Sequence, residues 1–147
     1  MKKMTVVFFP EADASGSLLF IGQPDGLQTF GSWLEQRAAS TERAPVRLDA
    51  SNGFDPRARC EAFVVIDERS DSHAVAARRG DRWQVSWHVS PSRCLRAAGL
   101  VRSFAETRGR GGHQYLEESG RVSIEIAYGD WREGVWKKGV LKMIASE

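Results

Sequence analysis

Eight consecutive residues, 83–90, alternate strictly between apolar and polar side chains. Successive side chains of an extended strand point to opposite faces, so this period of two predicts a half-buried β-strand. Two sets of side chains would then lie on opposite faces: Trp83, Val85, Trp87 and Val89 against a core, and Gln84, Ser86, His88 and Ser90 away from it. The same alternation returns over residues 122–128. These two segments predict a sheet with one buried face.

Other segments also predict strands. Residues 1–10 and 17–22 are apolar runs separated by a turn-rich stretch, which favours an N-terminal hairpin. Residues 46–48 form a short candidate strand within a loop-like region. Residues 62–66 are continuously apolar and rich in β-branched side chains, which is typical of a central strand covered on both faces.

A tight turn predicts the register of one hairpin. Glycine at the first central position suits a two-residue type II′ turn, and Gly80–Asp81 stands between residues 73–78 and the strand that begins near Trp83. In that register His73 lies opposite His88. Ala74 lies opposite Trp87 and Ala76 opposite Val85, so small residues make room for large ones.

Two segments predict helices. The first opens at Pro24 and Asp25 and carries apolar residues at helical spacing up to Ala38, although Gly31 interrupts it. The second opens with Ser90 as the N-cap and Pro91 at the first helical position. Its apolar stripe consists of Cys94, Ala97, Ala98, Val101, Phe104 and Ala105.

The fold class that follows is α+β, with a single, mostly antiparallel β-sheet and two main helices packed on one face. At 147 residues the chain fits one domain, residues 1–147, large enough to bury a core without metal or disulfide support. The sequence of residues 130–147 is compatible with a strand pair and with a terminal helix, and it does not decide between them. Strand order cannot be inferred from these local patterns.

Composition excludes several classes of protein. A net charge of +2 is too small to indicate a nucleic-acid-binding domain, although arginines cluster near residues 57–59 and 78–82. Cys60 and Cys94 are too few and too far apart for a redox or zinc motif, so we expect buried, reduced thiols. The apolar run at the start is too short for a signal peptide, and no run is long enough to span a membrane. These features predict a cytoplasmic protein.

No catalytic motif stands out. A His73–His88 pair could supply two metal ligands, with Asp71 or Glu125 as a third, but the spacing is unspecific and we expect neither a metal nor a cofactor. His88 and Glu125 could form an acid–base pair only if their strands are neighbours. The glycine-rich segment 109–112 follows a helix rather than preceding one, so it is read as a loop and not as a phosphate cradle.

The second half of the chain carries a resemblance. The expected elements there are a strand hairpin, a short helix, and strand 113–117 leading into strand 122–126. This order of elements resembles that of small bacterial immunity proteins, which neutralise polymorphic or contact-dependent toxins. The resemblance implies a non-enzymatic inhibitor that binds a cognate toxin domain stoichiometrically, with no catalytic residues. Inhibitors of nuclease toxins are often acidic, whereas this chain is slightly basic, which argues against a nuclease partner.

Tryptophan, tyrosine and arginine are enriched at the energetic centres of protein interfaces. The predicted partner surface therefore combines the polar sheet face with the C-terminal aromatic segment: Gln84, His88, Glu125, Trp131, Arg132 and Trp136. The alternative is a small enzyme or ligand-binding domain that uses a cavity between sheet and helices, with His88, Glu125 and Tyr115 as polar groups. Nucleic-acid binding through the arginines ranks below both.

Overall fold

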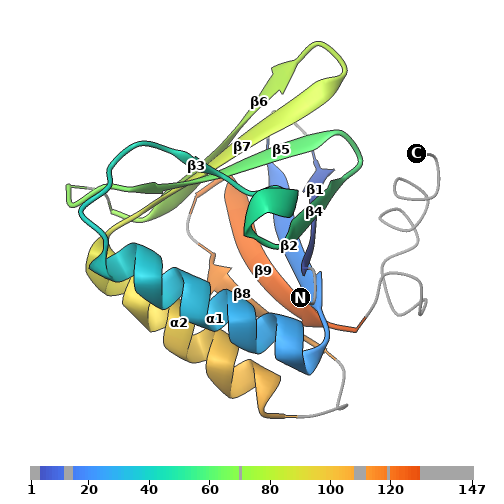
Figure 1. Cartoon of the computed structure of the whole chain (residues 1–147). Coiled ribbons are helices and arrows are strands. Elements are labelled where there is room, and N and C mark those ends of the chain that lie inside the picture. Colours follow the sequence, from blue (N-terminus) through green and yellow to red (C-terminus); the bar gives the residue numbers. More distant parts are fainter. Residues whose placement is uncertain (1–3, 12–14, 70, 108–111, 119, 130–147) are drawn as a thin grey trace.

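The computed structural model describes residues 4–11, 15–69, 71–107, 112–118 and 120–129, and residues 130–147 lie outside this part. The described elements follow one another along the chain as β1 (Met4–Pro10), β2 (Gly16–Gly22), α1 (Pro24–Ala39), β3 (Val46–Arg47), η2 (Ala50–Asn52), β4 (Phe54–Arg57), β5 (Cys60–Ile66), β6 (His73–Arg79), β7 (Arg82–Val89), α2 (Pro91–Ala105), β8 (His113–Glu117) and β9 (Val122–Tyr128). Helices and strands segregate as expected for an α+β protein (Figure 1).

The strands form a mixed sheet in the order β3-β5-β7-β6-β9-β2-β1-β4, and β8 pairs with β9 beside this path. The predicted hairpins β1–β2 and β6–β7 are antiparallel, and β8–β9, in which strand 113–117 leads into the next strand as expected, is antiparallel as well. However, β1–β4, β2–β9 and β5–β7 are parallel, so the expectation of a mostly antiparallel sheet is wrong. Parallel pairing joins strands that are not consecutive in the chain, and local sequence patterns carry no signal for it.

The sheet consists of two parts that meet at one residue pair. Strand β9 borders β2 along its whole length and β8 along most of its other side. Its other strand pairing among the described residues is a single bridge between Val122 and Ala74 of β6. Figure 1 shows the β6–β7 hairpin projecting away from β9 and β2, while β5 runs along β7 through seven residue pairs.

The two parts of the sheet also curl toward each other. The rings of Phe8 on β1 and Trp83 on β7 lie 5.1 Å apart, centroid to centroid. Four strand spacings separate β1 from β7 in the sheet order, which would be about 19 Å in a flat sheet. Aromatic packing across the concave side therefore closes the sheet over the core.

Both helices lie side by side on the same face of the sheet, as predicted (Figure 1). Their buried residues join the inner side chains of the strands in one hydrophobic cluster. Trp87 is the largest fully buried side chain, and Val85 and Val89 are buried beside it on β7. All six predicted stripe residues of α2 are buried. A small second cluster, Val7, Leu19 and Ile21, lies on the opposite face.

Local sequence explains how the helices begin and meet. The Ser90 hydroxyl accepts a hydrogen bond from the Arg93 amide, which confirms the predicted N-cap of α2. Gly31 lets α1 approach α2 closely, because a Cβ placed there would lie 2.7 Å from Cγ of Arg102 and 3.3 Å from the carbonyl oxygen of Ala98. Beside it, Arg102 donates a hydrogen bond to Ser32 at 3.0 Å.

Strand β5 differs from its prediction. Residues 60, 62, 64 and 66 are buried, whereas Phe63 and Val65 are only half-buried, so β5 is covered on one face and not on both. It also lies next to the short edge strand β3 rather than at the sheet centre. Both helices cover the face that carries residues 60, 62, 64 and 66, and neither covers the face of Phe63 and Val65. The β-branched run of β5 therefore reflects strand propensity more than burial on both faces.

Two helical glycines should respond oppositely to alanine. A methyl group at Gly99 of α2 would meet no described atom within 4 Å, so Gly99→Ala should raise the free energy of unfolding by about 0.5–1 kcal/mol. The free energy of unfolding of Gly31→Ala should be lower than that of Gly99→Ala by about 1 kcal/mol or more, because the new methyl group at residue 31 must displace Arg102. Urea unfolding of both variants tests this, and equal gains would contradict the close helix contact.

Candidate functional site

The β6–β7 hairpin brings two histidines together on the sheet face opposite the helices. Its register pairs His73 with His88 and Arg79 with Arg82, as the turn at residues 80–81 predicts. Gly80 has a φ of 63°, the left-handed conformation that this turn requires. The two imidazole rings stack with centroids 5.0 Å apart and 6° between their planes.

This stacking does not suit two ligands of one metal ion. Imidazole lone pairs lie in the ring plane, so two parallel, stacked rings direct them along separate planes and not to a common point. Glu125, considered as a third ligand, lies on β9 beyond β6. Over the residues that the structure describes, no three histidine, cysteine, aspartate or glutamate side chains gather to hold a metal.

The environment of His88 disfavours its charged form. Partial burial lowers the pKa of His88 below its usual 6.5, and the neighbouring His73 lowers it further, while Asp67 acts in the opposite direction. A neutral His88 can both donate and accept a hydrogen bond. His88 is therefore neutral over a wider pH range than a fully exposed histidine.

Two arginines lie on the hairpin without a carboxylate partner among the described residues. The guanidinium of Arg78 lies over the ring of Trp83, 5.7 Å from its centroid. Arg79 donates from Nε to Oε1 of Gln84 at 3.2 Å. Gln84, a predicted partner contact, is half-buried and is oriented by this bond. Both arginines are exposed and keep their positive charge available to a partner.

Other arginines near the hairpin tip are neutralised. Arg59 forms an ion pair with Asp81 of the turn. Arg82 lies 3.4 Å from Glu61, which is also 3.9 Å from Arg47. These exposed pairs connect β3, β5 and β7 at one end, and each contributes about 0–1 kcal/mol to stability.

Strand β6 has an open backbone edge. In a two-residue hairpin the closing pair is hydrogen-bonded, so the alternation of the ladder turns the backbone groups of residues 74, 76 and 78 away from β7. Ala74 meets Val122 of β9, but no described strand pairs with Ala76 or Arg78 on that side. Next to this edge, Val75 is an exposed apolar side chain. Sequence periodicity gives no signal for an open edge.

Glu125 does not lie where the sequence predicts. It is 5% exposed, and its Oε1 is 2.6 Å from Nδ1 of His113 on the adjacent β8. It does not meet His88, because β6 stands between β7 and β9 in the sheet. The expectation of an exposed Glu125 is therefore wrong, and the condition for a His88–Glu125 pair, neighbouring strands, is not met. In the β8–β9 hairpin, His113 covers this carboxylate.

The remaining predicted partner contacts, Trp131, Arg132 and Trp136, lie outside the described residues. Tyr115, named for the alternative function, is exposed on β8. It lines a cleft of about 300 Å³ between α2 and β8. Neither His88 nor Glu125 lines this cleft, although Glu125 lies opposite Tyr115 in the β8–β9 pair.

The sequence analysis missed the polar groups of this cleft, which are Arg93, Arg96 and Glu117. The spacing of the two arginines places them on one face of α2. Nothing in the sequence, however, indicates that β8 lies beside that face. Glu117 is 7% exposed because a bulge in β8 turns it toward the helix side of the sheet, opposite Ile124.

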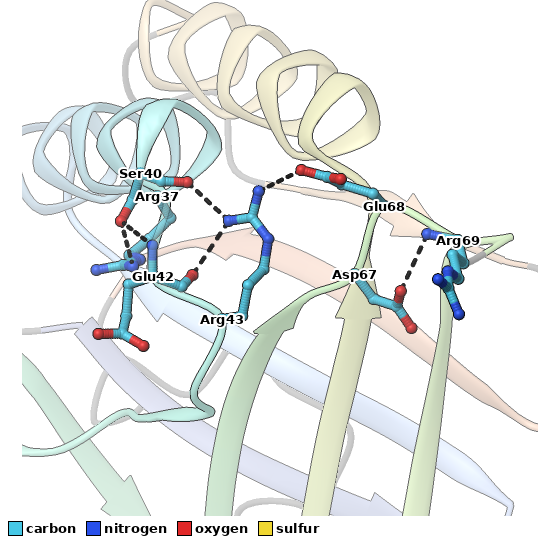
Figure 2. Close-up of polar contacts among 7 residues, drawn as sticks. All are labelled: Arg37, Ser40, Glu42, Arg43, Asp67, Glu68 and Arg69. Atoms are coloured by element: carbon cyan, nitrogen blue, oxygen red, sulfur yellow. Dashed lines mark hydrogen bonds and ion pairs between the residues drawn. The ribbon is translucent and has the colours of Figure 1, made fainter.

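A separate polar cluster lies where α1 ends (Figure 2). Arg43 donates hydrogen bonds to the carbonyl oxygens of Ser40 and Glu42, at 2.8 and 3.2 Å, and forms an ion pair with Glu68. Arg37 donates to the Ser40 hydroxyl at 3.0 Å. These contacts fasten the segment after α1 to the loop between β5 and β6, which is a structural role.

The lowered pKa of His88 predicts a loss of stability in acid. As the pH falls below about 6.5, the unfolded chain binds a proton at His88 before the folded chain does, so the free energy of unfolding decreases. Urea unfolding at pH 7.5 and 5.5 should show a smaller decrease for His88→Asn than for the unaltered chain. His73→Asn should lie between them, because His73 accounts for part of the shift. Identical decreases in all three proteins would contradict this role.

Within the described part of the chain, neither α1 nor α2 is long and apolar enough to cross a membrane. No protein-family model, no curated protein and no solved structure matches this chain.

Proposed function

We propose that this chain is a non-enzymatic protein-binding module, an immunity protein that neutralises a cognate bacterial toxin domain by stoichiometric binding. The observation that supports this best is the open edge of β6, where the backbone N–H and C=O groups of Ala76 and Arg78 point away from β7. An extended segment of a partner can add to such an edge through main-chain hydrogen bonds. The resemblance of the second half of the chain to immunity proteins is the other support.

The charges near this edge indicate the chemistry of the partner. Arg78 and Arg79 are exposed and form no ion pair with a described carboxylate. A strand that carries aspartate or glutamate would supply the missing counter-charges, and an apolar residue on it would cover Val75. The proposed partner segment is therefore extended, acidic and partly apolar.

The predicted contacts divide between two regions. Gln84 and His88 lie on the β7 face beside this edge and belong to the proposed surface. Glu125 leaves it, since it is buried against His113. Trp131, Arg132 and Trp136 remain proposed contacts outside the described residues, and the cytoplasm remains the proposed location. Cys60 and Cys94 support that location, because both are buried thiols and form no disulfide.

Variants of Arg78 separate the backbone edge from the arginine charge. Arg78→Pro removes the outward amide without breaking the ladder to β7, so it should weaken partner binding about tenfold more than Arg78→Ala, which keeps the amide. Calorimetric titration with the purified partner measures both, and circular dichroism confirms folding. Equal affinities of the two folded variants would contradict strand addition at β6.

Purification of the tagged chain from its native host, followed by mass spectrometry, should recover a stoichiometric partner with a toxin domain. Expression of that domain should stop growth, and co-expression of this chain should restore it. A folded Trp131→Ala/Trp136→Ala variant should lose the partner, because interface tryptophans dominate binding energy. Unfolding of this variant would assign both tryptophans to the core. A partner whose toxicity this chain does not relieve would refute the immunity function.

A further inference from the structure

The cleft between α2 and β8 contains more hydrogen-bond donors than the protein itself satisfies. Arg93 and Arg96 line it from one face of α2, and no acceptor pairs with either guanidinium among the described residues. Trp87 also lines the cleft, and its indole Nε1 is buried with no acceptor in the described part of the chain. The two exposed guanidinium groups are therefore available to an anionic group of a ligand.

The opposite wall carries negative charge. Glu117 is 7% exposed and lines the cleft from β8, and Glu118 follows it at the rim. A simple anion bound to the two arginines would be repelled by these carboxylates. A cationic group on the same ligand would remove that repulsion. The walls are therefore complementary to a molecule with both charges.

The remaining lining and the volume restrict the size of this molecule. Ala97 and Leu100 from α2 and Leu116 from β8 provide apolar surface between the charged groups. The volume of about 300 Å³ lies at the lower limit of small-molecule sites, which excludes a nucleotide and leaves room for one small apolar body.

We propose that this cleft binds a free α-amino acid with an apolar side chain. Its carboxylate would lie against Arg93 and Arg96, its ammonium group toward Glu117, and its side chain against Leu100 and Leu116. Charge-assisted hydrogen bonds at both ends would orient the ligand. This site is independent of the proposed toxin partner, and its test requires no partner.

Calorimetric titration of the full chain with L-leucine, L-methionine and L-phenylalanine tests the proposal directly. At least one free amino acid should bind with a sub-millimolar dissociation constant. Its N-acetyl form, which lacks the ammonium group, and its amide, which lacks the carboxylate, should each bind at least about tenfold more weakly. Failure of all three amino acids to bind, or equal binding of the N-acetyl form, would overturn the proposal.

Matched variants locate the binding. Arg96→Gln and Glu117→Gln should each weaken binding about tenfold or more, whereas Arg69→Gln, in the β5–β6 loop outside the cleft, should leave it unchanged. Arg93→Gln serves as a second variant at an exposed position of the cleft, in case the buried Glu117 substitution prevents folding. Binding that survives both the Arg96 and the Arg93 substitutions at full strength would place the ligand elsewhere and refute the site.

Discussion

The parallel pairing of β2 with β9 is the interaction on which the sheet depends. It joins residues 16–22 to residues 122–128 along seven consecutive residue pairs. On its other side β9 carries β8 and the single bridge from Val122 to Ala74. The N-terminal hairpin, the β6–β7 hairpin and β8 are therefore all positioned by one strand close to the end of the described chain. Contacts over such sequence separation cost loop entropy, which favours slow folding.

Features of this fold that depend on neighbouring residues could be predicted from the sequence. The turn at residues 80–81 determines the hairpin register down to the His73–His88 pair. The Ser90 cap and the apolar stripe of α2 predict where that helix begins and which face it buries. Each of these sequence signals lies within a segment of about fifteen residues. Their interpretation therefore does not depend on how the strands are ordered in the sheet.

Features that depend on strand order could not be predicted. Alternation correctly places Glu125 on the face opposite the helices, but it does not reveal that β8 brings His113 over that carboxylate. It also cannot show that β6 separates His88 from Glu125. The cleft beside Trp87 is of the same kind, because its arginines and its glutamate come from elements whose adjacency exists only in the folded chain.

The open edge of β6 also has a consequence for the behaviour of the chain toward copies of itself. An unpaired strand edge is a template for self-association, and natural sheets often protect such edges with charge. If two copies paired through this edge, Arg78 and Arg79 of one copy would lie close to the same arginines of the other, and their positive charges would repel. Salt screens this repulsion, so high ionic strength favours pairing between copies while it weakens attraction to an acidic strand. The same two side chains thus discourage pairing with an identical copy, and they would attract the acidic strand that we propose as the partner segment.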